Sequence, residues 1–557
     1  MTTDDIIFKD NFEKLRITKP AAARFLNQAT FGATKADIEY LQSIDYKTWI
    51  DEQIEMPPTL FVADFQEQVF ADHVSEGGEA TNMANLHVAA FWHHAGTARD
   101  QLRHRVAFSL SQFFVISDFN FALNNVISQT ESGYLKDASS NFYDLLLNNL
   151  FGNFRDLLEL ISKDIGMGKY LNMVDNIKSD PESETRPDEN FAREVLQLFS
   201  IGLVELNIDG TLVLDGSGRS IPTYNQETIE NFARIFTGWE YKTHIAFTND
   251  GYVYVYNEEQ MVSNELNHDV SSKTLLNGEV VPAGNTAQQD LSAALDNIFN
   301  HPNVAPFFCT FLIKHLVTSN PTAEYISHVS RVFANNGRGV RGDLSAVYKA
   351  ILLHPEARNG HIQYPDVFGR FREPLVRGVH LLRALKAKVG DMRQLNGSAV
   401  YPDYIYTYLI FEELYSGVLT SNNRDFEYTS QVVNFAKSVF NFYSTDYQLP
   451  GEIIDNNLYS PEFQISTETQ ITTCNNWLDR YAIWIGNLNY FDTQEEQLLA
   501  QESMELLIDH LNLIFMSGQM SDEMYTALIN NDGGSPENNL IEAVRHIIQS
   551  PEYVIQK

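Results

Sequence analysis

Cysteine is scarce in this chain, and its scarcity excludes two kinds of protein. The 557 residues contain only Cys309 and Cys474, in the stretches PFFCTFL and TTCNNW. Neither stretch has the spacing of a metal-ligand motif, so a disulfide scaffold and a cysteine zinc site are both excluded. Cys309 has aromatic neighbours, which predicts a small buried hydrophobic residue and not a nucleophile.

Positive charge is also scarce. Lys and Arg number 39 against 73 Asp and Glu, which gives a net charge of −34. Such a charge repels phosphate backbones and anionic membrane surfaces, so nucleic acid is not an expected partner. Long apolar runs are missing, so no membrane span is expected. The first residues lack the basic and apolar regions of a signal peptide, and both a cytosolic protein and a mature exported one fit this start.

Familiar catalytic motifs are missing as well. The sequence contains no GxSxG, P-loop, GxGxxG, paired CxxC or HExxH pattern. These patterns each carry a specific chemistry, for example a nucleophile elbow, a phosphate cradle or a zinc site. The sequence therefore indicates an architecture more clearly than a reaction.

What the sequence does contain is helical periodicity over most of its length. In GNFRDLLELISKDIG, four apolar residues follow helical spacing: Phe154, Leu157, Leu158 and Ile161. This spacing places them on one face of a helix. Proline follows a helical stretch at His301-Pro302, His354-Pro355 and Ser550-Pro551. Because proline cannot continue a helix but fits the first turn of the next, each pair predicts a corner between two helices.

Residues 206–284 interrupt the helical pattern. Short apolar runs alternate here with turn residues, and Asn277-Gly278 between two such runs predicts a β-hairpin. We expect a mainly α protein, 1–557 as one unit, with a small β-hairpin insertion at 206–284. The helical parts on either side are expected at 20–205, 285–390 and 391–557.

The pentapeptide Glu-Asn-Phe-Ala-Arg occurs twice, at 189–193 and at 230–234. Each copy is expected to begin a helix, with Thr223 and Gln226 at capping-box spacing ahead of the second. The spacing also predicts two i, i+4 ion pairs, Glu189 with Arg193 and Glu230 with Arg234. The flanking sequences differ, so the duplication indicates a shared way of starting a helix and not a repeated domain.

Two groups of polar residues are candidates for a functional site. The first copy adds Asp188 and Glu194 around Arg193. Such a group could bind a polar ligand, could tune a carboxylate for acid or base work, or could be a structural ion-pair network. The second group is His268, Asp269 and Lys273. A His beside a carboxylate can serve as general base or metal ligand, whereas the alternative is a loop whose polar side chains bond the backbone.

Eight stretches follow one another in an order that is familiar: AARFLNQATFGAT, GNFRDLLELISKDIGMGKYL, RPDENFAREVLQLFSIGL, FARIFTGW, HDVSSKTLLNG, NNGRGVRGDLSAVYKAILLHPEAR, VFNFYSTDY and SPEFQI. In these stretches the chain resembles the bacterial domain-of-unknown-function 1800 family from about Ala21 to its end. The family has no established reaction. The resemblance implies export to the periplasm or the cell exterior, and a partner of the domain-of-unknown-function 1501 family, whose members resemble sulfatases.

Polar positions that match the family's motifs are Asn176, Lys178, Asn190, Arg193, Glu194, Arg234, Trp239, His268, Asp269 and Lys273. The chain departs from some members at FSLSQFF, around Ser109 to Gln112, where they carry a Trp-His-Asn-His run. It also has Phe435 and Lys437 where they carry Arg and Pro. A metal site that relies on the missing His residues is not expected here.

Two classes of function remain open at this point. The first is an enzyme acting on a polar substrate at a pocket formed by the 176–194 segment and the 268–273 loop. In it Glu194, His268 and Asp269 would be catalytic, and the substrate would be bound by Asn176, Lys178, Asn190, Arg193, Arg234, Trp239 and Lys273. The second is a non-catalytic helical binding or assembly protein working with the sulfatase-like partner. No metal site is predicted, and the sequence names no cofactor.

Overall fold

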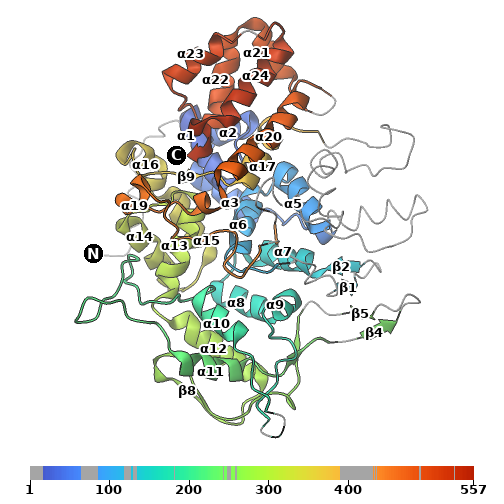
Figure 1. The fold of residues 1–557 in the computed structure, drawn as a ribbon, viewed down its shortest axis with the longest axis vertical. Helices are drawn as coiled ribbons and strands as arrows, with labels where there is room; N and C mark the ends of the chain where they lie inside the picture. Colours follow the sequence, from blue (N-terminus) through green and yellow to red (C-terminus); the bar gives the residue numbers. More distant parts are fainter. Residues whose placement is uncertain are drawn as a thin grey trace.

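The computed structural model describes residues 17–63, 86–117, 127–129, 135–180, 182, 184–242, 244–247, 253–256, 260–388, 431, 433–434, 436–488, 491–531 and 533–557. Helices dominate it, and the sheets are short two-stranded pairs (Figure 1). This confirms the predicted fold class. Phe435 and most of the stretch between 388 and 436 lie outside the described residues.

Several of the N-terminal helices begin at side-chain caps, which satisfy backbone N–H groups left free in the first turn. Thr18, Thr34, Asp45 and Asn153 each accept such a bond. On the helix that follows Asn153, the four predicted apolar residues are all buried. The helices of this part are α1 (Lys19–Ala29), α2 (Lys35–Ser43), α3 (Tyr46–Glu55), α5 (Leu86–Thr97), α6 (Gln101–Ser111), α7 (Ala138–Asn149), α8 (Phe154–Lys163), α9 (Ile165–Tyr170) and α10 (Asn190–Gln197).

The expected β insertion consists of separate antiparallel pairs around one helix, α11 (Gln226–Ile235). Asn277 and Gly278 both have positive φ, at 58° and 74°, and they join the last pair as the sequence predicts. The capping-box prediction is wrong, because Asn225 caps α11 by accepting the N–H of Thr228. The pairs are β3 (Trp239–Glu240) with β6 (Val262–Ser263), β4 (His244–Phe247) with β5 (Val253–Tyr256), and β7 (Lys273–Thr274) with β8 (Val280–Val281).

The central helices turn at the predicted proline corners. His301 and His354 are C-caps with extended backbone, and each precedes a proline at or near the start of the next helix. Pro551 likewise begins the short helix α25 (Pro551–Val554) after Ser550. The central helices are α12 (Ala287–Asn300), α13 (Val304–Leu316), α14 (Ala323–Ala334), α15 (Leu344–Leu353), α16 (Pro355–Gln363) and α17 (Pro374–Ala384).

Helices α21 to α24 lie at the top of Figure 1, with α1 and α2 below them, and α22 packs on α1. Two further strand pairs were not expected: β1 (Ile127–Gln129) with β2 (Leu135–Asp137), and β9 (Arg370–Phe371) with β10 (Ile555–Gln556). The latter joins the end of the chain to its middle. The C-terminal elements are α19 (Glu452–Asp455), the 3₁₀ helix η7 (Pro461–Ile465), α20 (Glu468–Ile485), α21 (Gln494–Glu502), α22 (Met504–Met516), α23 (Asp522–Ile529) and α24 (Pro536–Gln549).

One connected core runs through these helices, and it includes buried side chains from Ala22 to Tyr553. Cys309 and Cys474 are buried free thiols, and burial raises the pKa of both. For Cys309, this environment fits the predicted role of a small hydrophobic residue. In the described part of the chain, no helix combines the length and apolar character needed to cross a bilayer.

Gly238, between α11 and β3, is expected to tolerate no side chain. Its φ is +83°, and a Cβ there would lie 2.8 Å from the Asn264 oxygen and 2.9 Å from the His268 Cβ. We expect Gly238→Ala to lower the free energy of unfolding by about 3 kcal/mol or more, because backbone strain adds to overpacking. Gly278 has a similar φ of +74° and open space around it. Gly278→Ala should therefore cost only about 1 to 2 kcal/mol. Equal losses in urea denaturation would contradict the close-packing explanation.

Candidate functional site

The 176–194 segment is held by two reciprocal hydrogen bonds. The Asp188 N–H donates to Asn176 Oδ1 (2.8 Å), and Asn176 Nδ2 donates to the Asp188 carbonyl (3.2 Å). Asp188 Oδ1 in turn accepts the N–H of Asn190, where α10 begins (2.7 Å). Asn176 is buried, and both ends of its carboxamide are engaged within the loop. This arrangement fixes the loop against the start of α10.

The predicted ion pair on α10 is confirmed. Arg193 Nη2 lies 2.9 Å from Glu189 Oε2, and the Arg193 side chain is 41% exposed. Gln226, the first residue of α11, donates to both carboxylate oxygens of Glu189 at 3.0 Å. An exposed pair of this kind contributes roughly 0.2 to 0.5 kcal/mol. Its larger effect is to connect the starts of α10 and α11, which pack side by side.

Glu194 is the buried acid of the first group. Its Oε2 atom has no hydrogen-bond partner among the described residues. Burial raises the pKa of Glu194, against a smaller opposing effect of Arg193. The negative charge of this carboxylate also contributes to raised pKa values of Tyr170 and Tyr224, although burial is the larger cause for both. Burial therefore favours the protonated form of Glu194 more than it is favoured in a solvent-exposed carboxyl.

Arg234 does not pair with Glu230, so the second predicted ion pair is wrong. Arg234 instead reaches the 268–273 loop, where its Nε donates to Asp269 Oδ2 (2.9 Å) and its Nη2 to the Ser272 carbonyl (2.8 Å). Nη2 also donates to the Ser271 hydroxyl. Burial raises the pKa of Asp269, but the bonds from Arg234 and Ser271 outweigh it and lower that pKa to about 2. Several fixed acceptors in a half-buried loop bind the guanidinium better than one exposed carboxylate.

His268 and Lys273 turn into the protein, where both meet Asp290 of α12. His268 Nε2 lies 3.1 Å from Asp290 Oδ2, and Nδ1 lies 2.9 Å from the Thr237 carbonyl. Lys273 Nζ donates to the same Asp290 oxygen. The side chains of all three ionisable residues are 0% exposed. Burial raises the pKa of Asp290, but the bonds from His268 and Lys273 outweigh it and lower that pKa.

Backbone hydrogen bonds link the 176–194 segment to the residue just before the 268–273 loop and to the residue just before β3. The Gly238 N–H donates to the Asn176 carbonyl, and the Lys178 N–H donates to the Asn267 carbonyl, both at 2.8 Å. The side chains separate into two groups, since Lys178 is exposed whereas His268 and Lys273 are buried. Among the described residues, no hydrogen bond or ion pair joins Glu194 to the 268–273 loop.

Trp239 lies between the two groups. It is buried, and its carbonyl accepts the N–H of Asp175 at 2.8 Å. Its indole N–H has no partner within the described residues, and Lys163 Nζ lies 5.8 Å from the ring centroid. Through its backbone, Trp239 thus joins β3 to the residues just before the 176–194 segment.

Asp290 was missed by sequence reasoning. An acid near the start of a helix is ordinary, because it complements the helix dipole. The available signal was its place on the helix face that carries Ala287, Leu291 and Ala294, which is apolar and buried. A carboxylate within an apolar face needs a buried partner, but the sequence does not say which one.

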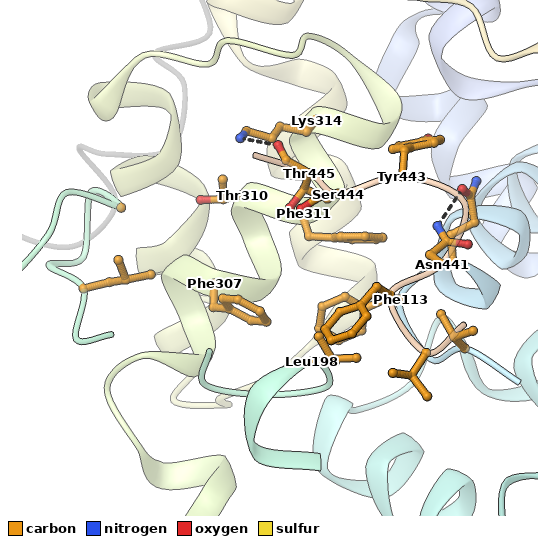
Figure 2. Close-up of a pocket in the computed structure, with 16 residues that line it drawn as sticks. Phe113, Leu198, Phe307, Thr310, Phe311, Lys314, Asn441, Tyr443, Ser444 and Thr445 are labelled. Carbon is orange, nitrogen blue, oxygen red and sulfur yellow. Dashed lines mark hydrogen bonds between the residues drawn. The ribbon is translucent and has the colours of Figure 1, made fainter. Parts of the chain in front are cut away.

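A cleft lies elsewhere, between α13, the end of α6 and the 439–445 loop (Figure 2). Its volume is about 200 Å³. Figure 2 shows Lys314 and Asn441 well apart, with the Phe311 ring between them in this view. The cleft is lined by five aromatic residues: Phe113, Phe307, Phe311, Phe440 and Tyr443. Its non-aromatic polar residues are Gln112, Thr310, Lys314, Asn441, Ser444 and Thr445. The remaining lining residues are Val115, Leu198, Leu206, Gly210 and Val439.

Buried charges lie directly behind this cleft. Arg370 Nη2 donates to Glu373 Oε1 (2.6 Å), and Arg370 Nε donates to Glu462 Oε1 (2.9 Å). Gln112, which lines the cleft, donates to the other Glu373 oxygen (2.9 Å). The pKa values of Glu373 and Glu462 are shifted in opposite directions. Burial raises the pKa of Glu462, whereas for Glu373 the charges of Arg370, His315 and Arg105 outweigh burial and lower the pKa to about 2.

Sequence reasoning missed the cleft because its walls come from distant parts of the chain. Two signals were available, since the 439–445 loop belongs to the stretch VFNFYSTDY and Gln112 and Phe113 to FSLSQFF. Lys437, one of the departures noted above, is exposed and does not line the cleft. Within the described residues, no three His, Cys, Asp or Glu side chains gather in a way that could hold a metal ion.

A family model described as "Protein of unknown function (DUF1800)" matches residues 24–555. The chain belongs to the DUF1800 family. This confirms the resemblance inferred from the motifs. No curated protein and no solved structure matches the chain. The DUF1800 match spans both polar groups and the cleft, so all three belong to the family unit, but it assigns no activity to any of them.

The contact of Lys273 with Asp290 predicts a large loss of stability when the acid is removed. Asp290→Asn leaves a buried ammonium group without an opposing charge, which costs about 3 to 5 kcal/mol. Asp296→Asn is the matched control, because Asp296 is on the same helix and pairs with Arg155 while 62% exposed. The control should change the free energy of unfolding by at most about 1 kcal/mol. Similar urea midpoints for the two variants would show that the fold does not depend on Asp290 as the opposing charge for Lys273.

The raised pKa of Glu194 predicts a pH-dependent effect. Between the ordinary pKa of Glu and the raised value, the folded protein binds more protons than the unfolded chain, so stability falls as the pH rises through this range. Glu194→Gln removes this loss. The variant should therefore gain stability relative to the parent at pH 8, and the gain should shrink at pH 4.5. Glu230→Gln, an exposed control, should stay within about 0.5 kcal/mol of the parent at both pH values. A gain that is equal at the two pH values would contradict the prediction.

Proposed function

We propose that this protein binds a small ligand in the cleft between α13, the end of α6 and the 439–445 loop. The observation that carries the proposal is a cavity of about 200 Å³ that combines aromatic rings with polar side chains from several elements. Ligand sites in proteins are typically concave and mostly apolar, with a few placed polar groups. This volume lies below the range of about 300 to 1,000 Å³ usual for drug-sized molecules, so the ligand is small.

Lys314 gives the cleft a polar group that is rarely buried. Burial lowers the pKa of Lys314 to about 8, against the opposing attraction of Asp446 and Glu462. Its Nζ donates to the Thr445 carbonyl (2.9 Å) and lies 3.8 Å from the Tyr459 ring centroid. One bond to protein leaves donor capacity for a ligand, because an ammonium group has three N–H donors.

The buried group around Asp290 supports a structural role more than a catalytic one. A substrate must touch a catalytic side chain, and the side chains of His268, Lys273 and Asp290 are 0% exposed. We therefore propose that His268 and Lys273 position the loop. This favours the expected class of non-catalytic binding protein at that location.

An enzyme acting on a polar substrate is the second candidate, and Glu194 is the observation that favours it. A buried carboxyl with one unbonded oxygen and a raised pKa suits a general acid. In this proposal Arg193 and Lys178 bind the substrate at the surface. Asp269 and His268 keep their predicted catalytic assignment only if the 268–273 loop opens.

Export to the periplasm or the cell exterior, and assembly with a protein of the domain-of-unknown-function 1501 family, are also proposals. Both rest on what the family resemblance implies.

The ligand-binding proposal is tested by ligand-observed NMR with a library of small fragments. We expect fragments that bind the parent protein to lose about tenfold in affinity on Phe307→Ala, because a half-buried ring on the cleft wall is removed. Ile362→Ala, on α16, removes a side chain that is 70% exposed and does not line the cleft. Affinity should be unchanged in this control. The proposal fails if no fragment binds, or if the two variants bind every fragment equally.

A further inference from the structure

Glu373, buried behind the cleft, determines whether the wall at Asn441 offers a hydrogen-bond donor or an acceptor. This carboxylate is 0% exposed, and the charges around it keep its pKa near 2 despite burial. An ionised carboxylate can only accept hydrogen bonds. Whatever contacts its oxygens must therefore present a donor.

Gln112 and Asn441 transmit this requirement to the cleft. Gln112 presents its NH₂ group to Glu373 (2.9 Å), so its carbonyl oxygen faces the other way. Asn441 then presents its own NH₂ group to that oxygen (3.0 Å), as the dashed line in Figure 2 shows. The orientation of each amide follows from the one behind it. Among the described residues, no donor bonds the side-chain carbonyl oxygen of Asn441, and Asn441 lines the cleft, so this wall offers an acceptor.

The far side of the cleft offers the opposite polarity. Lys314 is a donor with no acceptor capacity, and one of its N–H groups already bonds the Thr445 carbonyl. Between these two sides lie apolar rings, with the centroids of Phe113 and Phe311 4.7 Å apart. A ligand that fits must accept a hydrogen bond from Lys314 at one end and donate one to Asn441 at the other. Between these ends it must present an apolar face.

Charge narrows the ligand class further. The protein carries a net charge of −34, which disfavours the approach of an anion. Lys314 opposes a cation within the cleft, because like charges in a partly desolvated site repel. A neutral ligand meets neither obstacle.

We propose that the cleft binds a neutral sugar or a similar cyclic polyol. Hydroxyl groups both donate and accept, and the C–H face of a sugar ring is apolar, which matches the two walls and the rings between them. This inference rests on the ligand-binding function proposed above, and it adds the class of ligand. Asn441 is then the residue that recognises a ligand hydroxyl, and Gln112 positions it.

The test uses saturation-transfer NMR with three kinds of probe on the full chain. The neutral probes are glucose, galactose, N-acetylglucosamine and myo-inositol, the anion is benzoate and the cation is benzylamine. We expect at least one neutral probe to bind, and its affinity to fall about tenfold on Asn441→Gly, since one hydrogen bond to the ligand is lost. Glycine is chosen because Asn441 has a φ of +64°, which glycine adopts without strain.

Asn457→Gly is the matched control. Asn457 also has a positive φ, at 55°, and it is exposed and outside the cleft lining. It should bind the sugar like the parent protein. Sugar binding that is equally strong on Asn441→Gly overturns the assignment. Benzoate or benzylamine binding that depends on Phe307, without any sugar binding, overturns the ligand class but leaves the ligand-binding function standing. If no probe or fragment binds, both fail.

Discussion

The contacts of Arg370 with two buried carboxylates hold together parts of the chain that are far apart in sequence. Arg370 belongs to β9, Glu373 directly precedes α17, and Glu462 belongs to η7. Through Gln112, the same cluster also fixes the end of α6. Removing one member of such a cluster leaves an uncompensated buried charge, which is costly in a medium of low polarity. The position of the cleft walls therefore depends on an electrostatic requirement as well as on apolar packing.

Two buried polar clusters thus have different relations to the surface. The cluster of His268, Lys273 and Asp290 is closed on all sides and connects only protein groups. The cluster of Glu373 continues through Gln112 to Asn441, which lines a cavity. A His beside a carboxylate resembles a catalytic pair in sequence. A functional site differs from a purely structural cluster in that a ligand can reach it. Access for a ligand depends on the tertiary structure.

What the sequence could predict was local. Helical faces, the Asn277-Gly278 turn, the proline corners and the pair of Glu189 with Arg193 all depend on residues a few positions apart, and the structure contains them. Apart from the capping box before α11, the failures involve partners at long range. Arg234 prefers Asp269 to its helical neighbour, and Asp290 receives His268 and Lys273 from a preceding loop. The cleft joins residues near 112, 310 and 441, and no periodicity encodes that meeting.

The pairing of β9 with β10 has a consequence for how the protein is made. Arg370 and Phe371 pair with Ile555 and Gln556, and the Gln556 amide donates to the carbonyl of Leu316 in the core (3.0 Å). During synthesis, β9 emerges from the ribosome long before its partner strand exists. The helices around Arg370 can form early, but this strand pair closes only after residues 555 and 556 have been translated. Until then the backbone groups of β9 lack these pairing partners.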